Sequence, residues 1–398
     1  MTSLHDHELL KTAMITEVTG LLTQRLARPL PGQLRRGAKR KTNSIATAPV
    51  GRRYAARMRS KVTISDVARV AQVSKATVSR TLNRPELVVP EVRDRIRKVM
   101  ADLDYEPNRH ARALSGIHSR TVGLLFFKDI WDLVINPFWG MAASTVYDNL
   151  LQRDLDCNLI SIGHAMSFRE RFRTREQYAQ FFRTRNVDGF LLMGPVSADH
   201  EDYFASSDIP AVMWGRPELA ESRLTHFDSD NVGGSALAVD YLVARGRRTI
   251  AMIDGDMTLA SARDRHEGYT QALRRNGRES NPNLVAAGDF SRQSGAEAMR
   301  QLLDREPALD AVFAANDEMA VGAMEVLASR GIRVPVDVSI VGFDNATLPE
   351  WPGPRLTSVS PAYNEIGKEL VSALSMLMDG ETCASRLIAA TLVLGETV

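Results

Sequence analysis

Short apolar runs recur along the larger, C-terminal part of the chain, and they constrain its fold more than any other feature. Seven of them have the length of strands, at residues 122–127, 157–162, 187–193, 211–214, 249–253, 311–314 and 338–343. Most are separated by amphipathic segments of helical length, and repeated strand–helix units predict parallel sheets with helices on both faces. Because roughly 275 residues follow this pattern, we expect two similar lobes around a cleft instead of one small sheet.

The charge of the chain is divided between a basic front and an acidic remainder. Residues 1–120 contain 24 Lys and Arg against 10 Asp and Glu, a net charge of +14, and the other residues contain 26 against 38, a net charge of −12. This asymmetry indicates a polyanionic partner for the front alone, the alternative being a basic tail that is merely solvated. No apolar run is long enough to span a membrane. Cys157 and Cys383 have no metal-ligand or disulfide spacing, which is typical of a reduced, cytoplasmic protein.

The first sixty residues are rich in Arg and poor in acidic residues. They lack a continuous apolar segment followed by a small-residue cleavage site, so they do not resemble a secretory signal. We expect residues 1–60 to be a disordered basic extension; alternatively, translation starts at Met58. A basic tail of this kind can add weak, salt-sensitive affinity for DNA.

Two short helices joined by a tight turn are predicted next. Thr63 and Asp66 have the spacing of a capping box that opens the first helix. Ser74 is placed to cap the second, with Val73 and Val78 at the positions of a hydrophobic staple. The second helix exposes small, hydrogen-bonding or cationic side chains, as a helix in a major groove requires. A third amphipathic helix follows. A protein-binding helical bundle is the alternative, and the basic charge favours DNA.

These residues resemble a known family. The segment VTISDVARVAQVSKATVSRTLN, followed by LDYEPNRHARALSG, is similar to the DNA-binding headpiece and hinge of the lac-repressor family, and the similarity continues to about residue 395. It implies a small all-α helix-turn-helix headpiece over 61–106 and a hinge helix and linker over 107–120. It also implies an α/β, two-lobed, periplasmic-binding-protein-like sensor over 121–398, with parallel sheets, that binds an effector and dimerises.

The resemblance also implies lobe boundaries. The first lobe is expected over about 121–222 plus 361–379, and the second over about 223–356 plus 384–398. Two departures from the family pattern lie in the headpiece. Gln72 stands in the turn where Gly is usual, and Val89 replaces the usual Ser cap before the third helix. The lost side-chain cap is expected to cost about 1 kcal/mol, although proline suits the first helical position that follows.

The headpiece residues take roles in DNA recognition from the resemblance. Lys75 and Ala76 would be the base-reading pair, Arg109 part of the hinge helix, and Leu114 the wedge that opens a base step in the minor groove. The residues expected at DNA are Thr63, Ser74, Lys75, Ala76, Thr77, Ser79, Arg80, Asn83, Asn108, Arg109, Arg112 and Leu114.

The effector site is expected beyond the carboxyl ends of the strands, where ligands bind in open α/β sheets. The resemblance places Arg265, Asn316 and Asp344 at effector-contact positions and Phe290 at the position of an aromatic that packs on the ligand. An aromatic ring, a guanidinium and carboxamide or carboxylate groups suit sugar hydroxyls, each of which donates and accepts hydrogen bonds. The residues expected at the effector are Phe138, Arg263, Arg265, Phe290, Asn316, Asp344 and Trp351. Asp228 and Asp317 are expected to be structural.

No sequence signature of an enzyme is present, whether nucleophile elbow, zinc-protease helix, P-loop or dinucleotide fingerprint. We expect no cofactor or metal. The chain is predicted to be a homodimeric repressor of carbohydrate-utilisation genes that binds a pseudo-palindromic operator and is controlled allosterically by a sugar. The alternative effector is a purine or a phosphorylated metabolite that acts as a co-repressor; Arg216 and Arg263 are the extra cations it would use.

Overall fold

The computed structural model describes residues 62–83, 85–105, 120–163, 175–185, 187–219, 221–346 and 352–398. The chain divides into two compact units, Met1–Tyr105 and Glu106–Val398, which are described separately. The predicted extension over 1–60 and the predicted hinge over 107–120 lie outside the described residues, apart from Arg120. The same holds for the predicted site residues Asn108, Arg109, Arg112, Leu114 and Trp351.

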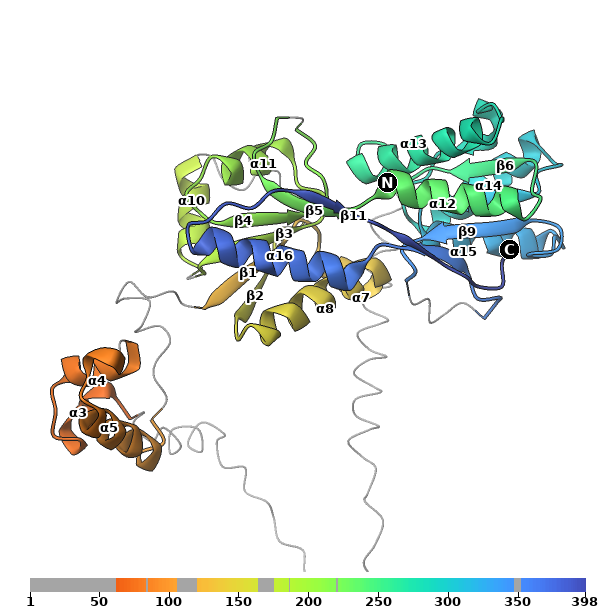
Figure 1. Cartoon of the computed structure of the whole chain (residues 1–398). Coiled ribbons are helices and arrows are strands. Elements are labelled where there is room, and N and C mark those ends of the chain that lie inside the picture. Colours follow the sequence, from red (N-terminus) through yellow and green to blue (C-terminus); the bar gives the residue numbers. More distant parts are fainter. Residues whose placement is uncertain are drawn as a thin grey trace, which may run out of the picture. The chain divides into compact units, whose positions relative to one another are not determined.

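The described part of the first unit is helical (Figure 1). Its elements are α3 (Ile64–Val70), α4 (Lys75–Asn83), the short 3₁₀ turn η1 (Pro85–Leu87) and α5 (Pro90–Asp102). The three α-helices share one small core of buried side chains, which consists of Val67, Ala68, Ala71, Val78 and Ile96. These small and branched residues allow the short helices to pack closely, as the predicted apolar faces require.

Two six-stranded sheets form the second unit. The first sheet has the order β11-β5-β4-β3-β1-β2 and contains β1 (Thr121–Phe126), β2 (Asp156–Ser161), β3 (Gly189–Met193), β4 (Ala211–Trp214), β5 (Thr225–Ser229) and β11 (Arg386–Ile388). The second has the order β12-β10-β9-β8-β6-β7 and contains β6 (Ile250–Ile253), β7 (Val285–Ala286), β8 (Ala311–Ala314), β9 (Ser339–Phe343), β10 (Thr357–Ser360) and β12 (Thr391–Val393). All pairs are parallel except that of β10 with β12. The predicted α/β fold is therefore confirmed.

Helices cover both faces of the first sheet (Figure 1). One face carries α8 (Pro137–Gln152) and α16 (Tyr363–Met378), and the other carries α10 (Arg175–Arg183) and α11 (Ala198–Ala205). A short helix, α7 (Ile130–Ile135), precedes α8. Around the second sheet lie α12 (Asn231–Ala244), α13 (Ala260–Arg275), η2 (Pro282–Leu284), α14 (Arg292–Arg305) and α15 (Asp317–Ser329). None of the described helices is long and apolar enough to cross a membrane.

The lobe boundaries differ from those predicted. Strand β5 pairs with β4 and β11 pairs with β5, so both belong to the first lobe, whereas β10 belongs to the second. The predicted boundary near residue 222 and the assignment of all of 384–398 to the second lobe are therefore wrong. The physical reason is burial: Phe227 and Ile388 are at most 4% exposed and lie in the core of the first lobe. The chain thus crosses between lobes after β5, β10 and β11.

Candidate DNA-binding and effector sites

The entry into α3 has the predicted capping box. Both the backbone N–H and the hydroxyl of Thr63 donate to Asp66 Oδ2, at 3.0 and 2.7 Å. These bonds, with a further one from Arg69, lower the pKa of Asp66 to about 2. Thr63 and Asp66 are both solvent-accessible, so the cap fixes the start of the helix without burying the charge of the carboxylate.

Helix α4 presents the predicted recognition surface. Ser74 Oγ accepts the backbone N–H of Thr77 at 3.0 Å, which confirms the predicted cap. Val78 is fully buried and Val73 packs against the same core, which confirms the predicted staple. The side chains of Ser74, Lys75, Ala76 and Arg80 are exposed, whereas those of Thr77 and Ser79 are partly buried; the side chain of Asn83 lies outside the described residues. The exposed side chains of α4 are thus either short or positively charged, which suits a helix that enters a major groove.

Both predicted departures have structural consequences. Gln72 has a φ of 56°, in the left-handed region that favours glycine, so the turn between α3 and α4 holds its side chain at a conformational cost. Val89 precedes α5 without a side-chain cap, and Pro90 occupies the first helical position. Helices α4 and α5 still form, but the turn carries a strained residue and α5 begins without a side-chain cap.

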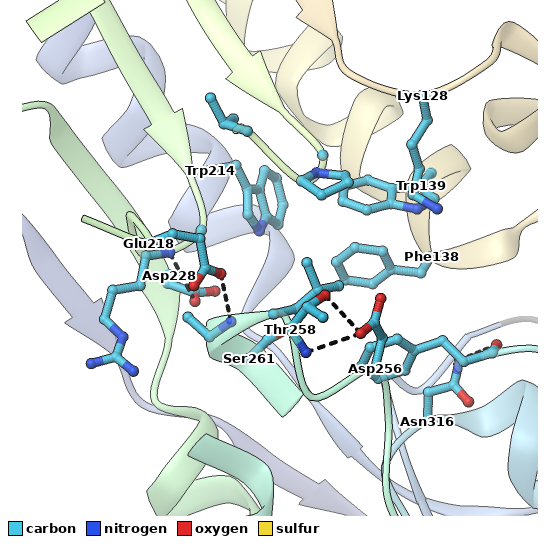
Figure 2. A pocket seen from close by; sticks show the side chains of 18 of the residues that line it. Lys128, Phe138, Trp139, Trp214, Glu218, Asp228, Asp256, Thr258, Ser261 and Asn316 are labelled. Atoms are coloured by element: carbon cyan, nitrogen blue, oxygen red, sulfur yellow. Dashed lines mark hydrogen bonds between the residues drawn. The ribbon is translucent and has the colours of Figure 1, made fainter. Parts of the chain in front are cut away.

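A cavity of about 340 Å³ lies between the two lobes of the second unit (Figure 2). The first lobe contributes three aromatic rings, those of Phe138, Trp139 and Trp214. The second lobe contributes mainly polar side chains beyond the carboxyl ends of its strands, together with one further ring, and these are Asp256, Arg265, Asp289, Phe290, Asn316 and Asp344. The apolar faces thus come mainly from the first lobe, whereas both lobes contribute hydrogen-bonding groups, Glu218 and Asp228 among those of the first.

Arg265 is the buried centre of the polar side. Its Nε donates to Asn231 Oδ1 at 2.9 Å, and its Nη1 donates to the carbonyl of Ala315. The same Nη1 lies 3.3 Å from Asp344 Oδ1, and the guanidinium stacks 3.7 Å from the ring centroid of Phe343. Because these contacts fix the guanidinium in one orientation, it can form directional hydrogen bonds to a ligand at little entropic cost.

Asp344 lines the cavity, and its carboxylate faces the Arg265 guanidinium. Its carboxylate is buried, and its Oδ1 has no hydrogen-bond partner among the described residues beyond the ion-pair contact with Arg265. Burial raises the pKa of Asp344 to about 6, although the Arg265 charge opposes this. A buried acceptor of this kind is normally satisfied. The ion pair with Arg265 is the contact that compensates this buried carboxylate.

Asp317 holds the turn that carries Asp344. Its carboxylate accepts from Ser358 Oγ at 2.6 Å and from the backbone N–H of Ala346 at 2.7 Å, and Ser358 Oγ in turn accepts the N–H of Asn345. Asp344 and Asn345 both have positive φ, so this network stabilises a backbone that would otherwise be strained. Asp317 does not line the cavity. Its position supports the predicted structural role.

Asn316 and Phe290 are joined at the cavity wall. The amide of Asn316 caps α15 through Met319 N and donates to the carbonyl of Phe290 at 3.0 Å, so the protein uses both of its ends. Phe290 has a φ of 71° and lies with its ring 5.8 Å from the Arg265 guanidinium. A Cβ at Gly255 would lie 2.2 Å from this ring, so only glycine leaves room for it.

The structure therefore brings most of the predicted effector residues together. Phe138, Arg265, Phe290, Asn316 and Asp344 all line the cavity.

Arg263 does not line the cavity, which contradicts its predicted position. It lies two residues from Arg265 on α13, and at 100° per residue the two side chains point to different faces of the helix. Its guanidinium pairs instead with Glu218 of the first lobe. Arg216 does line the cavity but is paired with Asp264.

Sequence analysis missed several residues of the site. Asp228, predicted to be only structural, lines the cavity and accepts from Asn231, and burial raises its pKa to about 6. Trp214 ends the apolar run of β4, so the strand-end rule could have found it. Trp139 follows a predicted site residue directly. Asn231, which does not line the cavity but accepts a hydrogen bond from Arg265, could not be found by this rule, because the strand before it, β5, was not among the predicted strands.

Both units match known families. Residues 63–108 match the bacterial regulatory proteins of the lacI family, and residues 239–398 match the periplasmic binding protein-like domain. The chain is 35% identical over 326 residues to the HTH-type transcriptional regulator CelR of Thermobifida fusca. The aligned region covers 81% of this chain and 94% of the relative. It is 32% identical over 334 residues to the HTH-type transcriptional repressor CytR of Escherichia coli, with 83% and 94% covered.

Solved structures agree with these matches. A complex of the transcriptional regulator CelR with cellobiose superposes with a TM-score of 0.64 at 34% identity, covering 85% of this chain and 100% of the other. The lac repressor dimer bound to operator and the anti-inducer ONPF gives a TM-score of 0.71 at 26% identity, covering 84% and 98%. These relatives are regulators, which confirms the prediction that the chain is not an enzyme. The chain is a DNA-binding transcriptional regulator and belongs to the lacI family of bacterial regulatory proteins.

Proposed function

We propose that this regulator is a homodimer that represses carbohydrate-utilisation genes, and that a neutral sugar bound between the lobes changes its affinity for a pseudo-palindromic operator. The observation that carries the proposal is the cavity itself. It combines aromatic rings on one lobe with the ion-paired Arg265 and Asp344 on the other. Sugars need both kinds of group, because their ring faces are apolar and their edges carry hydroxyls.

The charge of the cavity favours a neutral ligand over a phosphorylated one. The lining cations are Lys128, Arg216 and Arg265, and the lining carboxylates are Glu201, Glu218, Asp228, Asp256, Asp289 and Asp344. Arg216 and Arg265 already have acidic partners. An anionic metabolite would therefore meet an excess of negative charge, whereas a neutral sugar would use as hydrogen-bond acceptors the carboxylate oxygens that hold no contact with the described residues, such as Oδ2 of Asp256. The solved complex of a transcriptional regulator CelR with cellobiose makes that disaccharide the first ligand to test.

The residues proposed to bind DNA lie at the starts of α3 and α4, along α4 and over 108–114, the last of which lies outside the described residues. Lys75 and Ala76 at the exposed start of α4 would read base edges, and Thr63, Ser74, Thr77, Ser79, Arg80 and Asn83 would support base or phosphate contacts. Asn108, Arg109, Arg112 and the wedge Leu114 would act in the minor groove. Effector binding would change operator affinity by about 1–3 kcal/mol, the usual range of such coupling.

Fluorescence anisotropy tests the proposal. The full chain is titrated onto labelled DNA from upstream of its own and neighbouring genes, at two salt concentrations, with cellobiose, other mono- and disaccharides, glucose 6-phosphate and a purine base as separate additions. We expect high-affinity binding that a neutral sugar shifts by roughly tenfold or more. A shift produced by the phosphorylated sugar or the purine alone would contradict the neutral-sugar assignment. Only weak binding with a steep salt dependence on every fragment would contradict sequence-specific recognition.

A further inference from the structure

The loop that follows β4 is fixed to the first lobe by buried carboxylates. Glu201, on α11, is 1% exposed and accepts the backbone N–H groups of Glu218 at 2.7 Å and Leu219 at 3.1 Å. Asp228, at the end of β5, accepts the backbone N–H of Arg216 at 3.3 Å. The loop is therefore held in one conformation, and its side chains project towards the other lobe from a rigid base.

Glu218 reaches from this loop to the start of α13 in the second lobe. Leu259 occupies the N-cap position of α13 and supplies no side-chain cap. Glu218 Oε1 accepts the N–H of Ala260 at 2.7 Å, and its Oε2 accepts from Arg263 Nη2. A carboxylate is favoured at this end of a helix because the unsatisfied N–H groups and the helix dipole both attract it. The first lobe thus caps a helix of the second.

A second ion pair crosses between the lobes beside the first. Arg216 pairs with Asp264, whose side chain is 18% exposed. We refer to Arg216, Glu218, Arg263 and Asp264 as the interlobe clamp. Exposed ion pairs normally contribute little, because ordering two long side chains consumes the Coulombic gain. Here the carboxylates of the first lobe have already fixed the loop, so less entropy remains to be lost when the pairs form.

The clamp is continuous with the effector cavity. Arg216 and Glu218 line it from the first lobe, as do Leu259, Ala260 and Ser261 from the second. Arg265, the buried guanidinium of the site, follows Asp264 directly on α13. A movement of α13 relative to the first lobe would therefore displace the polar side of the cavity from its aromatic side.

We propose that Glu218 and Arg216 are interlobe positioning residues, which hold α13 against the first lobe and so keep the two halves of the cavity in register. They act through the position of α13 and not through the effector's recognition chemistry. This inference does not depend on the identity of the effector, because every contact of the clamp joins one part of the protein to another. Arg263 and Arg216, which the sequence suggested as ligand contacts, would then join the two lobes.

Hydrogen exchange of the full-length protein, with no ligand added, tests the proposal. The variants are Arg216→Glu, Asp264→Arg and the double reversal, and mass spectrometry follows peptides that cover 215–219 and 258–264. Asp264→Arg should accelerate exchange at the amides bonded to Glu201, in the other lobe, by about fivefold. Arg216→Glu should do the same at the start of α13. The double reversal should return both peptides to within about twofold of the parent.

A matched control uses an ion pair that lies within one lobe. Arg275 of α13 pairs with Asp240 of α12 in the second lobe. The reversals Arg275→Glu and Asp240→Arg invert an Arg–Asp pair that joins α13 to a helix of its own lobe, and they should leave exchange over 215–219 unchanged. This control separates a crossing between lobes from a general effect of charge on α13.

Glu218→Ala removes the helix cap itself and gives a second, independent test. It should accelerate exchange at the amide of Arg263, which is bonded within α13 to the carbonyl of Leu259 and not to Glu218. Cooperative thermal unfolding of each variant verifies that it is folded. The proposal is overturned if single reversals affect only the lobe that carries them, if the double reversal exchanges as fast as the singles, or if Glu218→Ala leaves α13 unchanged.

Discussion

The two units of the chain place their functional residues in opposite surroundings. In the first unit, the core is small and apolar, and the predicted DNA contacts Lys75, Ala76 and Arg80 are exposed on α4. In the second, the residues of the effector site are themselves buried: Arg265 and Asp344 are 6% and 5% exposed and paired with each other. Function and stability are therefore separable in the first unit and coupled in the second. We therefore expect a substitution in the cavity to change folding as well as binding, and one at an exposed position of α4 to change binding alone.

The largest effect is expected from Arg265→Ala. The substitution removes the guanidinium from the cavity and leaves Asp344 buried without its partner, so both sugar affinity and stability should fall. We expect sugar affinity to decrease by more than about 100-fold and unfolding free energy to fall by about 3 kcal/mol. Isothermal titration and urea unfolding measure these effects. Arg274→Ala, on the exposed surface of the same helix, is the control and should change neither. Loss of binding without loss of stability would break the proposed coupling.

The ionisation of Asp344 should give the next largest effect. Its pKa is raised from 3.8 to about 6 in the folded state, mainly by burial. A raised carboxyl pKa stabilises the protein fully below pH 4, and this contribution is lost as the pH rises through 6. The unfolding free energy of the parent relative to Asp344→Asn should therefore decrease by roughly 2 kcal/mol between pH 4 and 7. Urea unfolding at several pH values measures it. A pH-independent difference between the two proteins would show that burial does not control this group.

Lys75→Ala tests the other side of the comparison. Because the side chain is exposed at the start of α4, we expect operator affinity to fall about tenfold while the unfolding free energy changes by less than about 0.5 kcal/mol. Lys98→Ala on α5 removes the same charge from another exposed helix position. Anisotropy should show a smaller loss for this control. Equal losses for the two variants would mean that Lys75 acts by charge alone and reads no base.

The smallest effect is expected at the turn between α3 and α4. Gln72 has a φ of 56°, which glycine adopts without strain, so Gln72→Gly should raise the unfolding free energy of the first unit by up to about 1 kcal/mol. Gln72→Ala retains the Cβ and should give no such gain. Thermal unfolding measures both variants. A similar stabilisation by alanine would point to the side chain, and not the backbone, as the source of the cost.

The local contacts of the first unit could be predicted from the sequence more completely than the contacts between distant segments in the second unit. The caps at Thr63 and Ser74 join residues three apart, so the sequence spacing alone predicts them, and the structure confirms both. The strand-end rule, with the family resemblance, placed Arg265 and Asp344 in the cavity. It failed for Arg263, because the direction of a helical side chain changes by 100° per residue and which face meets the cleft is a tertiary property.

The lobe boundary and the interlobe clamp were beyond sequence analysis for a related reason. Strand β5 has Phe227 as its one strongly apolar residue, and the buried residues that follow, Asp228 and Ser229, are polar, so it lacks the apolar run of a buried strand. Its place in the first sheet is fixed by pairing with β4 and β11, which are distant in sequence. Glu218 and Ala260 are likewise separated by 42 residues, and no local pattern joins them. Contacts between lobes become visible only when the topology is known.

The central claim is that sugar binding and operator binding to this protein are thermodynamically coupled. Because such coupling must be the same in both directions, measuring it in both directions tests the claim most directly. The affinity for cellobiose is measured by isothermal titration with the free protein and with the protein saturated with operator DNA, and the operator affinity is measured with and without saturating cellobiose. We predict that both ratios differ from one by about tenfold and are equal within error, as linkage requires. Identical cellobiose affinities with and without operator, or failure of cellobiose to bind, would contradict the account.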